Sequence, residues 1–361
     1  MSEPHAARSP ALPLLIIAAI VATIVVLFVW AAGWIGPSRV SGGTVANALQ
    51  YNAGLHRGYR RAHAKGMCIA GGFEANGAGT TLSKADVFRT GRSMAIGRFS
   101  TGGGNPLAND GRNVFHAMAL RIISPNGQEW RTAMDHTAIF PVADVKSFVA
   151  QQIATQPDPK TGKPDPALLT AYLAKHPETK RFMDYMKTIP LPNSFANGTY
   201  HSINAFRFID AAGRTRLVRW KMVPEDKLVA LDKSKLATLP KNYLFDEFIQ
   251  RLKAGPVRWH LIVTLANPGD VTDNATIQWT GPHRQIDVGT LTIDRWAPEE
   301  TGDCRDFNYD PTVLPPGIAV SDDPLLSARS AVYSTSYTRR AQEGSGPSAI
   351  GAQFGISGKK Q

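Results

Sequence analysis

An uncharged apolar segment near the N-terminus is the strongest constraint on how this chain folds. Residues 11–36 contain no Asp, Glu, Lys or Arg and consist mainly of Leu, Ile, Val and Ala. About 20 such residues in a helix span a hydrocarbon core of roughly 30 Å, and Trp30 and Trp34 lie near one end, where interfacial aromatic residues are common. Because the segment is longer than a typical signal-peptide core, we predict an uncleaved transmembrane anchor after a tail of residues 1–10. A cleaved signal is the alternative.

The charges beside the anchor discriminate little between the two orientations, since Arg8 precedes it and Arg39 follows it. Long domains cross membranes largely regardless of such charges. We predict a cytoplasmic N-terminus and a single-pass membrane protein whose main domain lies in the periplasm. Cys68 and Cys304 are able to form one disulfide there, although two cysteines do not fix the compartment.

The chain of 361 residues carries a formal net charge of +11. Such a balance can reflect nucleic acid, anionic lipid or anionic ligands as partners. The sequence has no block of five basic residues and no nucleic-acid-binding motif. We therefore predict no nucleic-acid partner and assign the excess to solvated Lys and Arg side chains.

Composition divides the rest of the chain into a linker over residues 37–50, a folded domain over residues 51–340 and a poorly ordered tail over residues 341–361. Strand-like segments, bounded by turn residues such as those at 125–127 and 210–213, are residues 94–100, 115–124, 205–209, 215–222, 257–266 and 285–293. Helix-like segments are residues 142–153, 166–185 and 242–254. The predicted fold class is α+β, a large antiparallel sheet or barrel with helical insertions.

The most informative segment for chemistry is residues 325–340. If it is helical, Arg329 and Tyr333 are four residues apart and share a face. A guanidinium beside a phenol favours the ionised phenolate, and a phenolate can ligate ferric haem iron. Arg340 lies seven residues after Tyr333, where it suits a propionate carboxylate. The alternative is an ordinary exposed helix with a partly buried tyrosine.

The spacing Arg-x-x-x-Tyr, followed by Arg340, resembles the proximal haem signature of the haem catalases, and within them of the shorter catalase-related peroxidases. Upstream, residues 309–318 (YDPTVLPPGI) resemble the family pattern Phe-Asp-Pro-x-x-x-Pro-Pro-Gly-Ile. The resemblance implies a catalase-type antiparallel β-barrel, a haem b cofactor and Tyr333 as the axial ligand of the iron. It covers most of residues 51–340 and lacks the parts that build much of the catalase tetramer and NADPH site, so neither property is carried over and the oligomeric state stays open.

Two further blocks resemble the distal side of the same family. Residues 60–66 (RRAHAKG) are similar to Arg-Val-Val-His-Ala-Lys-Gly, which implies that His63 is the catalytic histidine and that Arg60 binds a propionate. Residues 97–101 (GRFST) are similar to Val-Arg-Phe-Ser-Thr, which implies a second propionate arginine, Arg98, and a serine, Ser100, that orients His63. A neutral imidazole can move a proton between the two oxygens of a peroxide.

A fourth block departs from the family pattern. Asp135 stands where catalases carry the asparagine that donates a hydrogen bond to peroxide, and an ionised Asp cannot donate; a one-residue slip would put His136 there instead. Phe140 and Phe148 keep the places of two aromatic residues near the haem. Ala62 replaces a family valine and leaves more room for an organic peroxide.

In the family, a histidine and an aspartate also lie next to the arginine that pairs with the tyrosine ligand, on the side away from the haem. Here Asp323 fits the aspartate, and Asn204 takes the place of the histidine.

We expect a peroxidase that reduces organic hydroperoxides or hydrogen peroxide through a ferryl intermediate, using an external electron donor. A true catalase, an enzyme that rearranges hydroperoxides on the same fold, and a non-enzymatic, membrane-tethered haem sensor or carrier are the alternatives.

Overall fold

The computed structural model describes residues 11–31 and 40–350, in two units that divide after Val40. The first unit contains helix α1 (Ala11–Ala31). Residues 11–30 of α1 are long and apolar enough to cross a membrane, and an N-terminal signal sequence would share these properties. The rest of the predicted anchor, residues 32–36, lies outside the described residues.

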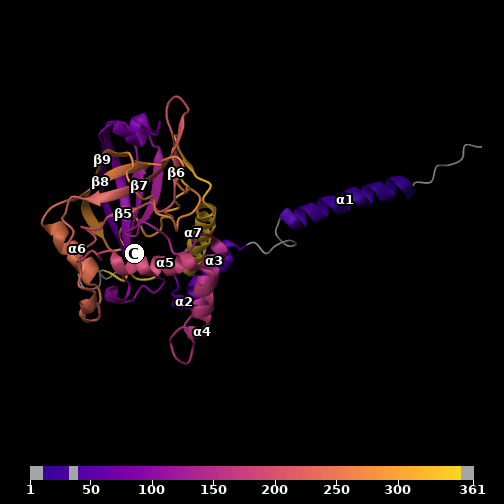
Figure 1. The fold of residues 1–361 in the computed structure, drawn as a ribbon, viewed down its shortest axis with the longest axis horizontal. Coiled ribbons are helices and arrows are strands. Elements are labelled where there is room, and N and C mark those ends of the chain that lie inside the picture. Colours follow the sequence, from indigo (N-terminus) through magenta and orange to yellow (C-terminus); the bar gives the residue numbers. More distant parts are fainter. Residues whose placement is uncertain (1–10, 32–39, 351–361) are drawn as a thin grey trace, which may run out of the picture. The chain divides into compact units, whose positions relative to one another are not determined.

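The second unit is built on a closed antiparallel barrel of eight strands (Figure 1). In barrel order these are β1 (Gly66–Ala75), β2 (Gly91–Thr101), β3 (His116–Ile123), β4 (Glu129–Asp135), β5 (Tyr200–His201), β7 (Thr215–Pro224), β8 (Val257–Leu265) and β9 (Gln285–Ala297). Strand β9 pairs with β1 and closes the ring, which leaves no free barrel edge. Strands β6 (Phe206–Ile209) and β10 (Ile318–Val320) extend the sheet from β7. The predicted fold class is confirmed.

Alternation of side chains explains why these segments form the barrel wall. In β4, Trp130, Thr132 and Met134 are buried, while the residues between them are partly exposed, as the two-residue period of a strand requires. Aromatic rings fill much of the interior. Phe99, for example, stacks on Phe195, with ring centroids 4.7 Å apart, and meets the edge of Phe248 at 4.8 Å.

The two predicted turns form the connections between neighbouring strands. Gly127 has a φ of 85° between β3 and β4, and Gly213 has a φ of 81° between β6 and β7. Asp210 fixes the second turn, because its carboxylate accepts hydrogen bonds from the backbone N–H groups of Ala212 and Arg214. Asn-Gly and Asp-initiated turns at these places are therefore local determinants of the strand pairing.

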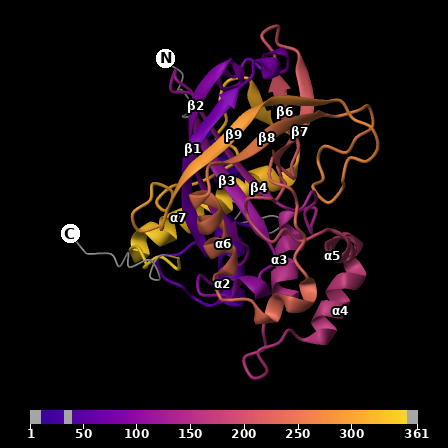
Figure 2. The ribbon, with the colours of Figure 1, turned by 90° about the vertical axis from the view of Figure 1, so that its left-hand side faces the viewer.

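Six α-helices belong to the described part of the second unit: α2 (Gly42–Ala53), α3 (Val145–Ala154), α4 (Pro166–Lys175), α5 (Pro177–Thr188), α6 (Tyr243–Lys253) and α7 (Pro324–Glu343). Short 3₁₀ turns are η1 (Ala78–Thr81), η2 (Asp86–Phe88), η3 (Asp110–Arg112) and η4 (Lys233–Thr238). Helices α2 to α5 group beyond one end of the barrel (Figures 1 and 2). Helix α2 packs on both α3 and α7.

The structure differs from the sequence interpretation in three segments. The helix predicted over residues 166–185 is two helices, since Pro177 forces the preceding residue out of helical geometry. Most of the predicted linker is helix α2, which Ser41 caps through its side chain. In the predicted tail, α7 continues to Glu343 and Ile350 is fully buried, so residues 341–350 pack on the domain. Residues 351–361 lie outside the described residues.

Candidate functional site

A large cavity lies between the barrel and the helices, with a volume of about 1400 Å³ including its open mouth. Ten residues to which the sequence assigned a catalytic or haem-binding role line it: Arg60, His63, Arg98, Ser100, Asp135, Phe140, Phe148, Arg329, Tyr333 and Arg340. The structure therefore brings together side chains that lie up to 280 residues apart.

One wall of the cavity carries His63, in the loop that precedes β1. Its Nδ1 lies 3.3 Å from the Ser100 Oγ, and Ser100 shares a face of β2 with Arg98. Burial, together with the charges of Arg98, Arg329 and Arg60, lowers the pKa of His63 to about 4. His63 is thus a neutral imidazole at ordinary pH, and a proton on Nδ1 would leave Nε2 as the acceptor.

Backbone strain marks this cavity as well. His63 (φ 53°) and Ile203 (φ 64°) are the two non-glycine residues with a positive φ in the described ranges, and both line the cavity. Such conformations cost roughly 1–3 kcal/mol each and cluster at functional sites.

Asp135 ends strand β4 and faces the cavity, whereas His136 does not line it. Instead, His136 Nδ1 accepts a hydrogen bond from the backbone N–H of His116. The structure therefore favours Asp135 at the position where sequence reasoning left both residues open. Burial raises the pKa of Asp135 to about 7, against the opposing charge of Arg329.

A chain of polar contacts supports Tyr333 on helix α7. The Arg329 Nη2 lies 3.4 Å from the Tyr333 hydroxyl, one helical turn away. The Arg329 Nη1 donates to the Asn204 Oδ1 at 2.6 Å, and the Asn204 Nδ2 donates to the Asp323 Oδ2 at 2.8 Å. Burial lowers the pKa of Arg329, but Tyr333 and the nearby carboxyl groups more than compensate and raise it overall. The guanidinium is thus permanently charged beside the phenol.

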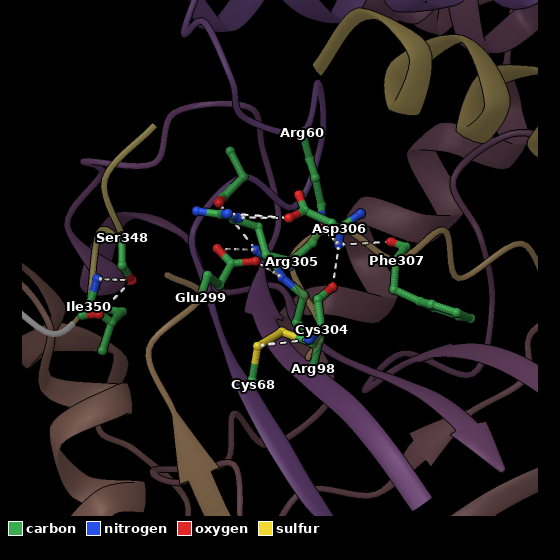
Figure 3. The surroundings of a disulfide bond; sticks show 11 residues. Arg60, Cys68, Arg98, Glu299, Cys304, Arg305, Asp306, Phe307, Ser348 and Ile350 are labelled. Carbon is green, nitrogen blue, oxygen red and sulfur yellow. Dashed lines mark hydrogen bonds and ion pairs between the residues drawn. A yellow bond between two sulfur atoms is a disulfide. The ribbon is translucent and has the colours of Figure 1, made fainter. Parts of the chain in front are cut away.

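Three arginines gather at one edge of the cavity, and we call Arg60, Arg98 and Arg340 the arginine cluster. Arg98 and Arg340 are buried, and Arg60 is partly buried. The Arg60 Nη2 donates to three backbone carbonyls of residues 304–307, and Arg98 forms a two-point ion pair with Glu299 (Figure 3). Burial and the charges of Arg340 and Arg98 lower the pKa of Arg60 to about 9. Within the described residues, the buried Nη2 of Arg340 has no hydrogen-bond partner.

These features fit a haem with its two propionates. The cluster and Glu299 together contribute three positive charges and one negative charge, which leaves two positive charges for two carboxylates. The unpartnered Nη2 of Arg340 gives a buried donor that an anionic oxygen would satisfy. Phe140 and Phe148, nearly parallel at 6.2 Å between centroids, offer an apolar surface for a flat ring system, and Tyr333 offers an oxygen ligand for iron.

Sequence reasoning missed Glu299 and the helix α2 side chains Val45 and Leu49, which also line or flank the cavity. No motif marks Glu299, because its role depends on the pairing of β9 with β1. Val45 and Leu49 are four residues apart and therefore share a helix face. That spacing was the available signal for a helix in the segment interpreted as a linker.

Comparison with known proteins identifies the family. A family model described as Catalase matches residues 56–345. The chain belongs to the catalase family. It is 38% identical over 298 residues to a "Catalase-related peroxidase" of Synechococcus elongatus, covering 82% of this chain and 88% of that protein. It is 31% identical to a "Catalase-related peroxidase" of Mycolicibacterium paratuberculosis, covering 81% and 93%.

Solved catalases share the fold. A structure described as "Structure of a bacterial catalase" superposes with a TM-score of 0.70 at 20% identity and covers 90% of this chain. The chain spans 64% of the length of that catalase. The predicted membership of the catalase-related peroxidases, and with it the prediction of a peroxidase enzyme, is confirmed. Catalase-family proteins generally bind haem.

Proposed function

We propose that this catalase-family enzyme is a haem b peroxidase that reduces organic hydroperoxides or hydrogen peroxide with electrons from an external donor. The observation that carries the proposal is the neutral, Ser100-bound imidazole of His63 in the same cavity as the Arg329–Tyr333 pair. When bound, haem would supply the iron that binds peroxide oxygen and accepts the donor's electrons. Tyr333 would hold that iron, and the arginine cluster would bind the propionates.

The protein's own groups would move the proton. The Nε2 of His63 would take the proton from the peroxide oxygen that stays bound and return it to the departing oxygen, which leaves as water or an alcohol. Ser100 fixes the ring through Nδ1. Arg329, held by Asn204, keeps a positive charge beside the Tyr333 oxygen and favours its ionised form.

The cavity also supports the choice of substrate class. Ala62 lines it beside His63, and a small side chain there leaves more space than a valine.

Asp135 supports peroxidase turnover in preference to catalase turnover at alkaline pH, because an ionised carboxylate offers peroxide no hydrogen-bond donor. Below pH 7 the protonated Asp135 can donate, which favours a true catalase as the second candidate function.

A purely haem-carrying role, as a sensor or carrier, is disfavoured by the His63–Ser100 contact, since a carrier has no use for an oriented base.

We also propose that α1 anchors the enzyme in a lipid bilayer with the catalytic domain in the periplasm. The Cys68–Cys304 disulfide supports that placement, because disulfides persist in oxidising compartments.

The test is to add haemin to the purified protein, record the absorption spectrum, and then add peroxide with and without a reducing substrate. We expect a high-spin ferric spectrum with a tyrosinate signature and donor oxidation that depends on peroxide. A rapid burst of oxygen without a donor would favour the true catalase. A protein that takes up no haemin would refute the proposal, and haem uptake without turnover would leave a carrier or sensor.

A further inference from the structure

The Cys68–Cys304 disulfide joins positions 236 residues apart and lies beside two members of the arginine cluster, Arg60 and Arg98 (Figure 3). Cys68, in β1, pairs with Arg98 of β2 on one side and with Ala297 of β9 on the other. Cys304 lies in residues 298–308, the segment that leaves β9, which we call the clamp segment. The disulfide therefore closes the clamp segment back onto the strand next to Arg98.

The clamp segment sets the position of two cluster arginines. Its first part contributes Glu299, whose carboxylate accepts from the Arg98 Nε at 2.7 Å. Its second part contributes the three carbonyls, of Cys304, Arg305 and Phe307, that accept from the Arg60 Nη2 at 3.0–3.1 Å. Because like charges repel, these acceptors help to hold the two guanidiniums at the cavity edge, together with the Ala64 carbonyl, which accepts from the Arg98 Nη2 at 3.1 Å.

The far end of the clamp segment has its own attachments. The guanidiniums of Arg121 and Arg131 lie 4.5 and 4.3 Å from the centre of the Phe307 ring, and the Arg131 Nη1 donates to the Asn308 carbonyl at 2.7 Å. These contacts do not depend on the disulfide. The Phe307 carbonyl would therefore remain near Arg60 if the disulfide were broken.

The position of the clamp segment around Gly302 and Cys304 depends much more directly on the disulfide. The Cys304 backbone N–H donates to the Cys68 Sγ at 3.2 Å. Gly302 packs so tightly against Cys68 that a Cβ there would lie 2.6 Å from the sulfur. Both half-cystines are buried, with 4% and 0% exposure. The bond thus orders the residues that carry Glu299 and two of the three carbonyls bound by Arg60.

We infer that the Cys68–Cys304 disulfide is a positioning element for the cofactor's carboxylates, so that breaking it releases haem from an otherwise folded domain. The inference rests on the proposed function, since the carboxylates are those of a bound haem. Breaking the bond requires two electrons and two protons, which two outside thiols supply as they join in a disulfide of their own, and it yields two free thiols. The enzyme would then hold its cofactor tightly only in an oxidising compartment.

The experiment compares the full-length chain with a C68A/C304A variant, an Arg60→Lys variant and the combination, all loaded with haemin. The measured quantity is the rate of haemin transfer to excess apomyoglobin. We expect each change alone to raise that rate about tenfold, as for the loss of one charge-assisted contact. The combination should be little faster than C68A/C304A alone, because breaking the disulfide already loosens two of the three carbonyl contacts that Arg60→Lys removes.

A matched control separates positioning from stability. Val263→Ala removes a fully buried barrel side chain in β8, and it should lower the melting temperature while keeping the haemin transfer rate within about twofold of the parent. A second readout needs no haem. In the apoprotein, hydrogen exchange of residues 299–305 should be faster in C68A/C304A, while residues 306–308 should exchange as in the parent.

An unchanged transfer rate in C68A/C304A, or rates that multiply fully in the combination, would overturn the inference. Unchanged exchange of residues 299–305 would overturn it as well. If the parent chain takes up no haemin, the proposed function fails instead, and the exchange experiment still decides whether the disulfide orders the clamp segment.

Discussion

Replacing Asp135 by asparagine should change the pH dependence of the reaction with peroxide. Burial raises the pKa of Asp135 to about 7, so the carboxyl is protonated in mildly acidic solution and can donate a hydrogen bond to bound peroxide. Above pH 7 it ionises and becomes an acceptor only. His63, whose pKa is lowered to about 4, must be neutral to accept the proton of the peroxide.

These two values predict a bell-shaped profile for the parent enzyme. The rate should rise with pH through about 4, as His63 loses its proton, and fall through about 7, as Asp135 ionises. One pH unit above its pKa, about a tenth of a group is protonated, so the rate at pH 8 should be about a tenth of the plateau. Asp135→Asn donates at every pH and should remain near the plateau at pH 8, about tenfold faster than the parent.

The assay is a stopped-flow measurement of the first step between the haem-loaded enzyme and peroxide, from pH 3.5 to 9 at constant ionic strength. Asp184→Asn, which removes an exposed carboxyl on α5, is the matched control and should keep the profile of the parent. The lower limb near pH 4 should be the same in all three proteins, because it belongs to His63.

The same titration predicts a change in the stability of the apoprotein. A carboxyl whose pKa is higher in the folded than in the unfolded state binds its proton more tightly when folded, so the unfolding free energy falls as pH rises from about 4 to 7. The rise of the pKa to about 7 corresponds to at most about 4 kcal/mol. Asp135→Asn should therefore be the more stable protein at pH 8 and gain nothing at pH 4.

An alkaline limb that survives unchanged in Asp135→Asn would refute the role given to this carboxyl. A parent rate that stays flat from pH 5 to 9 would do the same, since it would mean that the protonation of Asp135 does not affect peroxide binding.

Three other perturbations test separate parts of the structure. Tyr333→Phe removes the oxygen that would bind iron, so the tyrosinate signature in the haem spectrum should disappear; an unaltered spectrum would exclude Tyr333 as the ligand. Asp110→Asn leaves the buried Lys65 ammonium without its carboxylate and should lower the unfolding free energy by about 3–5 kcal/mol in denaturant titration; a loss below 1 kcal/mol would contradict this. Deletion of residues 1–40 should abolish sedimentation with membranes and leave the melting temperature unchanged, because the second unit has its own core.

The sequence predicted those features correctly that depend only on residues close together in the chain. The spacing of Arg329 and Tyr333 and the turn at Asp210 depend on residues close together in the chain, and the structure contains both as predicted. The break before Pro177 was also readable locally but was overlooked in a longer apolar pattern. Helix α2 was missed because Gly and Ser at its start outweighed the helical spacing that follows.

Features that depend on contacts between residues far apart in the chain could not be predicted from one sequence. Whether Asp135 or His136 faces the cavity is decided by strand register, since neighbouring residues of a strand point to opposite sides. The same holds for Glu299, which reaches Arg98 only because β9 and β2 flank β1. The resemblance to catalases located the arginine cluster, but it gave no indication that acceptors of the protein already bind Arg60 and Arg98.

These existing hydrogen bonds change how much each arginine of the cluster should contribute to the affinity for a propionate. An arginine that already has protein acceptors gains less from a carboxylate than an unpartnered one, because its hydrogen bonds are exchanged and not newly made. Arg340, whose buried Nη2 is unpartnered within the described residues, should therefore contribute most of the affinity for a propionate. Arg60 and Arg98 should mainly fix its place, since both are already bound to residues 299–307. Arg340→Met should consequently speed haemin loss more than Arg98→Met, and the opposite order would show that Glu299 gives way to the cofactor.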